Sequence, residues 1–406
     1  HDAHRGAVEV ERIGEDCGKE MNKSLLPTIV FSQFATTSLW FAVNAVLPDL
    51  QRLHPGFQNF LPTMTAAVQL GFVAGTLVFA WLSVADRFSP VRVFVVSAVL
   101  AATVNAGVLV LADSLPGLVA MRFLVGFFLA GVYPVGMKIC SDWYERGLGK
   151  ALGYLVGALV LGTAFPHALK ALSFSPDWRW VIAGTSGLAL SGALLMGLLV
   201  RDGPFRRPSG GFNPRVLGLV FRQPAYRTFA FGYFGHMWEV YTYWAFVPVM
   251  VATYNRLSGH HLDVPVWSFA AIAAGTLGCV LSGELSLRYG SARLAFWALT
   301  VSVACCLLSP LAALLAPAAF LLFLFVWGLT VVADSPQFSA LVSQNAVPEY
   351  RATAITIVNS IGFLITIPSL YVLQWAYSHL SERAGFTLLA AGGLLGLAAI
   401  WKAVWK

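Results

Sequence analysis

The sequence predicts an all-α integral membrane protein with twelve transmembrane helices, arranged as two pseudo-symmetric six-helix bundles. Of its 406 residues, 58% are hydrophobic and only 11% are charged, whereas about a quarter of the residues of a soluble domain are charged. Apolar stretches of about 20 residues, the length that crosses a bilayer as a helix, recur along the whole chain, and a segment of the first half is repeated in the second.

The predicted spans follow one another with short polar breaks. Their ranges are 25–46, 61–82, 91–112, 117–139, 149–171, 179–200, 227–252, 266–286, 294–316, 318–342, 353–377 and 385–404. The connection between the sixth and seventh spans is the longest and is rich in Pro, Gly and Arg. We therefore predict a tail at 1–24, an N-terminal bundle at 25–200, a cytoplasmic linker at 201–226 and a C-terminal bundle at 227–406.

The distribution of the 26 Lys and Arg residues predicts the orientation. With a cytoplasmic N-terminus, most of them fall on the inside, and those outside are Arg52, Lys170, Arg179, Arg256 and Arg383. Short cytoplasmic loops of membrane proteins carry such an excess. We expect a multi-pass protein of the bacterial plasma (inner) membrane with both termini in the cytoplasm. Residues 1–20 contain no apolar run and are expected to be disordered, whether native or an upstream extension.

Several classes of protein are disfavoured. The five cysteines are scattered without metal-ligand spacing, so neither a disulfide framework nor a metal site is expected. No phosphate-binding loop, His-Glu-x-x-His or Gly-x-Ser-x-Gly motif is present, so we expect no enzyme and no cofactor. The basic residues follow the membrane topology, which argues against a nucleic-acid partner; the expected partners are lipid, a small solute and protons, and the protein is expected to be a monomer.

The internal repeat aligns "LSVADRFSPVRVF" at 82–94 with "GELSLRYGSARLAF" at 283–296. A second pair aligns "VYPVGMK" around Pro134 with "DSPQFSA" around Pro336. Duplicated six-helix halves with a binding site between them are typical of secondary transporters.

These motifs resemble those of the major facilitator superfamily. "LSVADRFSPVR" is similar to its signature loop, and Arg122, Gly126 and Ala130 in "RFLVGFFLAG" match its Arg-x-x-x-Gly-x-x-x-Ala pattern. The resemblance covers the chain from about Leu25 to Trp405 and implies the twelve-helix fold and alternating access.

Within the superfamily, "GHMWEVY" and "ADSPQFSALVSQ" resemble bacterial members of the nitrate/nitrite and cyanate-type permease branch. The glycine-rich nitrate signature is absent, so nitrate specificity is not carried over. In the signature loop, Leu82 and Ser89 replace the usual glycines, while Gly283 and Gly290 keep them in the second copy. The Gly-Pro pattern of the fifth helix of drug/proton antiporters is also absent, which disfavours drug efflux.

Ionisable side chains inside a span are costly, about 2.5 to 3.5 kcal/mol each on insertion scales, and mark functional sites. His236, Glu239 and Tyr243 share one face of the seventh helix. We predict that this face turns toward a cavity while Trp238 and Tyr241 point elsewhere, with Glu239 as proton carrier and His236 as its tuner or a solute contact. The alternative is a structural or solvated pair.

Arg122 in the fourth span needs a partner at membrane depth. The sequence leaves open a solute anion, an ion pair with Glu239 or Asp334, or hydrogen bonds to backbone carbonyls. Asp334, just before Pro336, is a further candidate for proton coupling or gating, because a proline interrupts the helix there; it could equally brace the kink.

The remaining candidate residues are assigned by depth and by resemblance. Further candidate solute contacts, besides Arg122, are Gln33, Trp40, Asn44, His167, Tyr243, Gln337 and Asn359. The resemblance implies a gating role, holding the outward-facing state closed on the inside, for Asp86, Arg87, Arg92, Arg288 and Arg293. Lys138 is expected to snorkel to the interface.

The leading hypothesis is a secondary active transporter that moves a small organic or inorganic anion by alternating access, coupled to protons. One alternative is a proton-driven multidrug or metabolite efflux pump; another, of a different class, is a membrane scaffold or sensor without flux. The sequence leaves open the solute, the direction of transport, the choice between symport, antiport and uniport, and the oligomeric state.

Overall fold

The computed structural model describes residues 24–57, 59–144, 148–172, 177–206 and 212–405. These residues form helices and no strand. Ten helices among them are long and apolar enough to cross a membrane. The predicted tail at 1–24 lies almost wholly outside the described residues.

The N-terminal half begins with a helix over residues 24–37. Its other elements are η1 (Asn44–Val46), α2 (Leu47–Gln51), α3 (Phe60–Trp81), α4 (Val84–Arg87), α5 (Pro90–Leu111), α6 (Leu115–Leu129), α7 (Tyr133–Trp143), α8 (Leu148–Leu172) and α9 (Arg179–Leu199).

The short helices η2 (Pro214–Val216) and α10 (Leu217–Val220) lie in the connection between the halves. The C-terminal half then consists of α11 (Pro224–Ser258), α12 (Val264–Tyr289), α13 (Ser291–Ala312), α14 (Pro317–Thr330), α15 (Ser335–Asn345), η3 (Pro348–Tyr350), α16 (Arg351–His379), η4 (Gly385–Leu389) and α17 (Ala390–Val404).

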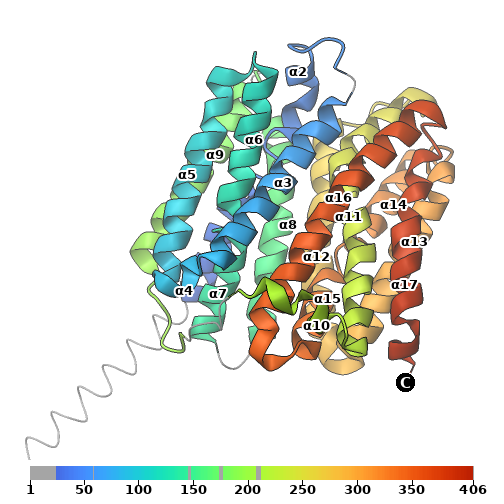
Figure 1. Ribbon diagram of the computed structural model, residues 1–406. Coiled ribbons are helices and arrows are strands. Elements are labelled where there is room, and N and C mark those ends of the chain that lie inside the picture. Colours follow the sequence, from blue (N-terminus) through green and yellow to red (C-terminus); the bar gives the residue numbers. More distant parts are fainter. Residues whose placement is uncertain (1–23, 58, 145–147, 173–176, 207–211, 406) are drawn as a thin grey trace, which may run out of the picture.

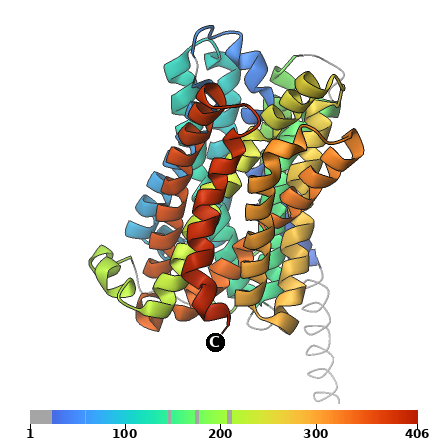
Figure 2. The ribbon, with the colours of Figure 1, turned by 90° about the vertical axis from the view of Figure 1, so that its right-hand side faces the viewer.

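The two halves stand side by side, the first drawn in blue to green and the second in yellow to red (Figure 1). They meet along α3 and α16 and along α8 and α12. We call the end that carries α4, α10 and the C-terminus the linker end, and the end that carries α2 the far end (Figures 1 and 2).

Local sequence explains several helix starts. Ser89 accepts a hydrogen bond from the backbone N–H of Arg92 and Pro90 opens α5, while Ser114 and Asp263 cap α6 and α12 in the same way. A side-chain oxygen at this position satisfies a backbone donor that the helix leaves unpaired. Ser89 therefore works as a helix cap where the resembling loops have glycine.

Three predicted spans are interrupted helices. The chain leaves helical geometry at residues 38–43, between α6 and α7, and between α14 and α15. Pro134 and Pro336 stand in the first turn of α7 and α15, where a missing N–H costs least. The two later breaks thus occupy equivalent positions of the repeat, as the second aligned pair suggested. The interruption at Pro336 was expected, whereas those at 38–43 and before Pro134 were not, and Leu115–Trp143 and Pro317–Asn345 are each still long and apolar enough to cross a membrane.

Glycines hold the helices of each half close together. A Cβ on Gly126 of α6 would lie 2.0 Å from the carbonyl oxygen of Val68 on α3, and one on Gly328 of α14 would lie 1.8 Å from that of Ala271 on α12. Backbones approach this closely between membrane helices only where side chains are very small. The glycine of the Arg-x-x-x-Gly pattern is therefore a packing residue, with a counterpart in the second half.

We expect Gly126→Val to separate α3 from α6 and to lower the thermal unfolding temperature of the purified protein strongly, because the clash is with backbone. Gly187→Val on α9 is the matched control, since no atom lies within 4 Å of its Cβ position. Equal unfolding temperatures for the two variants would contradict this account of the packing.

Candidate functional site

A cavity of about 1130 Å³ lies between the two halves. The N-terminal half contributes lining residues from α3, α7 and α8, and the C-terminal half from α11, α12, α15 and α16. At the linker end the lining residues Ser141, Glu284 and Gln344 are exposed, whereas Tyr241 and Trp244, deeper along α11, are buried. The cavity is therefore open at the linker end and closed toward the far end.

One face of α11 forms much of the cavity wall. Its lining residues recur every three or four positions: Tyr233, His236, Met237, Val240, Tyr241 and Trp244. This is the spacing of a single helical face. Polar groups on the opposite walls include Tyr133, Gln337 and Asn359, so the cavity combines aromatic surface with a few hydrogen-bonding side chains.

His236 sits at the edge of this face and pairs with Asp334. Its Nδ1 lies 2.8 Å from Oδ1 of Asp334, and the two side chains are only 2% and 1% exposed. Asp334 stands at the interruption between α14 and α15 and does not itself line the cavity. An ionisable group on the wall is thus joined to the hinge of a broken helix.

Glu239 lies behind the wall instead of on it. Its Oε1 accepts hydrogen bonds from Ser302 Oγ at 2.5 Å, Trp327 Nε1 at 2.7 Å and Cys306 Sγ at 3.2 Å. These donors belong to α13 and α14, so Glu239 joins three helices of the C-terminal half.

The predicted orientation of α11 needs correction. His236 lines the cavity, but Glu239 and Tyr243 do not, and the hydroxyl of Tyr243 donates to the carbonyl of Leu324. Tyr241, expected to point elsewhere, lines the cavity, while Trp238 points away and donates to the carbonyl of Leu388. The three polar residues do share a face, but only its edge meets the cavity.

Arg122 also lies outside the cavity wall. It is buried, and its guanidinium donates to the carbonyl oxygens of Leu39, at 3.1 Å, and of Trp40. Both carbonyls belong to the interrupted stretch 38–43. In the described part of the chain Arg122 makes no ion pair with Glu239 or Asp334. Of the three partners that the sequence left open, this conformation shows the backbone carbonyls.

The other candidate contacts divide between the wall and the bundle interior. Gln337 and Asn359 line the cavity, and Asp86 lines its mouth. Those buried within the N-terminal half and away from the wall are Gln33, Trp40, Asn44 and His167. Asn44 donates to Thr65, whereas both amide atoms of Gln33 and Nε2 of His167 have no hydrogen-bond partner among the described residues.

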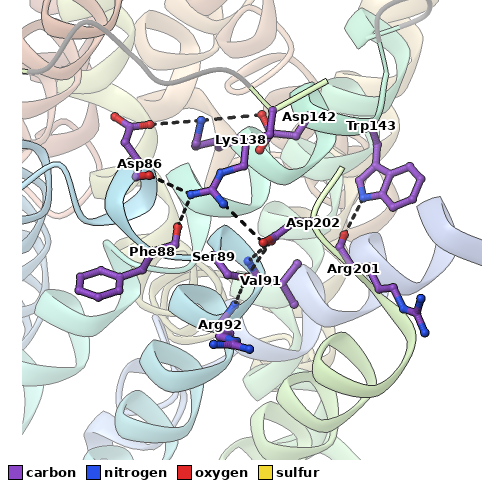
Figure 3. A network of polar contacts seen from close by, with 11 residues as sticks. Asp86, Phe88, Ser89, Val91, Arg92, Lys138, Asp142, Trp143, Arg201 and Asp202 are labelled. Atoms are coloured by element: carbon purple, nitrogen blue, oxygen red, sulfur yellow. Dashed lines mark hydrogen bonds and ion pairs between the residues drawn. The ribbon is translucent and has the colours of Figure 1, made fainter. Parts of the chain in front are cut away.

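The signature loop belongs to a polar network at the linker end (Figure 3). Nζ of Lys138 lies 3.3 Å from Asp86 and 3.7 Å from Asp142. Arg206 of the connection donates to the carbonyls of Asp86 and Phe88. Lys138 therefore lies at the cavity mouth, between two carboxylates.

Asp202 binds the end of the signature loop where α5 begins (Figure 3). It accepts hydrogen bonds from the hydroxyl of Ser89 and the N–H of Val91, at the start of α5. The contacts of Lys138, Arg206 and Asp202 described here all lie within the N-terminal half and its connection. The remaining predicted gating residues, Arg87, Arg92, Arg288 and Arg293, are exposed at helix ends of the linker end.

Sequence reasoning missed several wall residues. Tyr133, Tyr233, Tyr241, Trp244 and Glu284 line the cavity, and none of them is among the contacts that the sequence predicts. The three-to-four spacing of aromatic residues along α11 was the available signal.

The protein consists of two halves, each with interrupted helices, around a cavity that opens at one end. This architecture defines a membrane transporter of the alternating-access kind. Residues 29–370 match the sequence model of the Major Facilitator Superfamily, and the chain belongs to that family. Its relatives and its fold are those of transporters and not of enzymes.

Two curated relatives match part of the chain. A gentisate transporter of Corynebacterium glutamicum is 29% identical over 178 residues, which cover 41% of this chain and 38% of the relative. The inner membrane transport protein YnfM of Escherichia coli is 27% identical over 201 residues, covering 46% of this chain and 45% of the relative. The matched part thus spans less than half of each relative.

Solved structures share the fold at low identity. The proton:xylose symporter XylE superposes with a TM-score of 0.73 at 14% identity, over 94% of this chain and 96% of that one. The human organic anion transporter MFSD10 gives 0.70 at 15% identity, over 93% and 99%.

Proposed function

We propose that this protein is a secondary active transporter of a small organic anion and that protons are its coupling ion. The observation that carries the proposal is the pair formed by His236 on the cavity wall and Asp334 behind it, 2.8 Å apart and both nearly fully buried. Protonated imidazole bears a positive charge that Asp334 or a solute carboxylate can balance. A single proton can therefore link the solute site to the hinge before α15.

The aromatic wall suits a solute with a flat apolar part. Tyr233, Tyr241 and Trp244 lie on the same face of α11 as His236, and aromatic rings favour stacked or edge-to-face contacts worth about 0.5–1.5 kcal/mol each. Gln337 and Asn359 offer hydrogen bonds from the facing helices. The relative from Corynebacterium is named for gentisate, a small aromatic carboxylate, and we propose a solute of that class.

In the proposed cycle the solute anion enters the cavity and meets protonated His236, whose Nδ1 lies 2.8 Å from Asp334. The anion competes with Asp334 for the imidazolium. Binding thereby releases Asp334 from its partner and alters the hinge between α14 and α15, as the halves rock about the cavity. Loss of the proton on the other side of the membrane removes the charge that held the anion.

The orientation supports this cycle. Arg92, Arg288, Arg293 and Arg351 all lie at the linker end. If that end is cytoplasmic, as the positive-inside distribution predicts, the protein is inward-open here. We propose a monomeric, multi-pass protein of the inner membrane with both termini on that side; the resemblance to the nitrate/nitrite and cyanate branch has no counterpart among the two curated relatives reported above.

The test is lumenal pH in proteoliposomes loaded with a pH-sensitive dye. Separate pools of small aromatic carboxylates, inorganic anions and lipophilic cations are added outside, with empty liposomes as the control. We expect only the aromatic carboxylate pool to move protons. Proton movement driven by lipophilic cations instead would favour the efflux pump, and entry of labelled carboxylate without proton movement would leave a uniporter or exchanger. If no compound of any pool enters the liposomes and no protons move, the result supports the hypothesis of a scaffold or sensor without flux.

A further inference from the structure

We infer that six aromatic side chains form the gate that closes the cavity toward the far end, and that the interrupted stretch 38–43 is its moving part. The gate consists of Trp40 and Phe41 from that stretch, Phe72 from α3, Tyr241 and Trp244 from α11, and Phe363 from α16. The inference rests on the proposed transport, but three of the six rings, Trp40, Phe41 and Phe72, do not line the cavity, and the closure they make can be measured without a solute.

The gate rings make contact across the boundary between the halves. Ring centroids of Phe72 and Phe363 are 4.5 Å apart, and Trp40 stacks on Phe363 at 5.6 Å. Trp40 also contacts Tyr241 at 5.7 Å. All four rings are buried, so the layer they form separates the cavity from the far end.

A second side of the layer is made by Phe41. Its ring lies 6.4 Å from Tyr241 and meets Trp244 edge-on at 6.3 Å. Tyr241, Trp244 and Phe363 line the cavity, whereas Trp40, Phe41 and Phe72 do not. The C-terminal rings thus form the closed end of the cavity, and the N-terminal rings cover them from the far side.

The backbone that carries Trp40 and Phe41 can move because it is not held by a regular helix. Hydroxyls just before it bond to backbone carbonyls one turn back, Thr37 to Gln33 and Ser38 to Ala35, and such bonds bend helices. Arg122 then takes the carbonyls of Leu39 and Trp40. We assign Arg122 as a positioning residue that holds the gate stretch, not as a contact of the solute.

Two gate residues carry a polar group without a partner. Nε1 of Trp40 and of Trp244 are buried and have no acceptor among the described residues. A buried N–H that lacks an acceptor destabilises the closed arrangement. Ring contacts therefore stabilise the closed layer, while the two unpaired indole N–H groups destabilise it. Such a balance suits a gate that must open in each cycle.

The test measures a distance across the far end. Spin labels are attached to Arg52→Cys, directly after α2, and Arg383→Cys, between α16 and η4, two exposed positions of opposite halves, in a Cys17→Ser background; the other four cysteines are buried. Pulsed electron spin resonance in nanodiscs then gives the distance distribution. No solute is required, so a failure of the proposed function leaves this measurement intact.

Phe363→Ala removes two of the ring contacts that cross between the halves. We expect it to add a longer-distance population that the unsubstituted protein lacks. Phe320→Ala is the matched control, because Phe320 is a buried ring whose partner, Tyr254 at 3.9 Å, belongs to the same half. If Phe363→Ala and Phe320→Ala give the same distribution, the gate assignment is overturned.

Arg122→Met tests the positioning role by removing both hydrogen bonds while keeping a long apolar side chain. We expect the same longer population as with Phe363→Ala, at a thermal stability that still permits purification. If Arg122→Met unfolds, Arg122→Gln supplies the second variant, since its shorter amide cannot donate to the carbonyls of Leu39 and Trp40 together as the guanidinium does. An unchanged distribution in a folded variant overturns the role given to Arg122.

Discussion

His236→Gln is expected to abolish solute-driven proton movement and to destabilise the protein. The change leaves Asp334, which is 1% exposed, without the imidazole 2.8 Å away. Leaving a buried polar group without its partner costs about 1–3 kcal/mol, and more where that group is charged. The measurements are lumenal pH in proteoliposomes and the thermal unfolding temperature in detergent.

The double variant His236→Gln with Asp334→Asn separates the two effects. Because it removes both ionisable groups and puts two amides in their place, it should regain much of the unfolding temperature yet remain unable to move protons. His261→Gln is the control for the loss of an imidazole, since His261 is exposed in the loop before α12. Normal proton movement in the double variant would show that the pair is structural and that another group carries the proton.

The sequence was sufficient for the fold and for the places where the helices break near proline. Hydrophobic length marks a span, because the bilayer sets it, and the repeat aligned Pro134 with Pro336, which start α7 and α15. The break at residues 38–43 carries neither Pro nor Gly. It depends on Arg122 of another helix, which donates hydrogen bonds to two carbonyls of this stretch. A local sequence pattern cannot predict a contact between residues so far apart in the chain.

The candidate site was predicted less well because α11 is apolar and aromatic on all sides. Periodicity shows that His236 and Glu239 share a face, but not which neighbour that face meets. In the structure the cavity meets the Tyr233–Tyr241 side, and Glu239 meets Ser302 and Trp327. The hydroxyl of Ser302 and the indole N–H of Trp327, each more than sixty positions away in the chain, hold the carboxylate of Glu239. No pattern in the sequence predicts that these residues are in contact.

The position of Glu239 leads to a prediction that distinguishes a structural role of this residue from a role in proton coupling. Its Oε1 accepts from Ser302, Trp327 and Cys306, and a hydrogen bond between membrane helices is worth about 0.6–2 kcal/mol. Glu239→Leu leaves all three donors unpaired. We expect it to lower the free energy of unfolding by roughly 2–6 kcal/mol, the sum of three such bonds, which would appear as a strongly reduced unfolding temperature.

Glu239→Gln is the informative partner of that variant, because its amide oxygen can still accept from the three donors while no longer exchanging a proton. If Glu239 is a structural acceptor, Glu239→Gln keeps a near-normal unfolding temperature and still moves protons with the solute. If it carries the proton, as its depth in the membrane first suggested, Glu239→Gln is stable but moves none. The first outcome leaves coupling to the His236–Asp334 pair on the cavity wall, whereas the second requires a proton path from that wall to the interior of the C-terminal half.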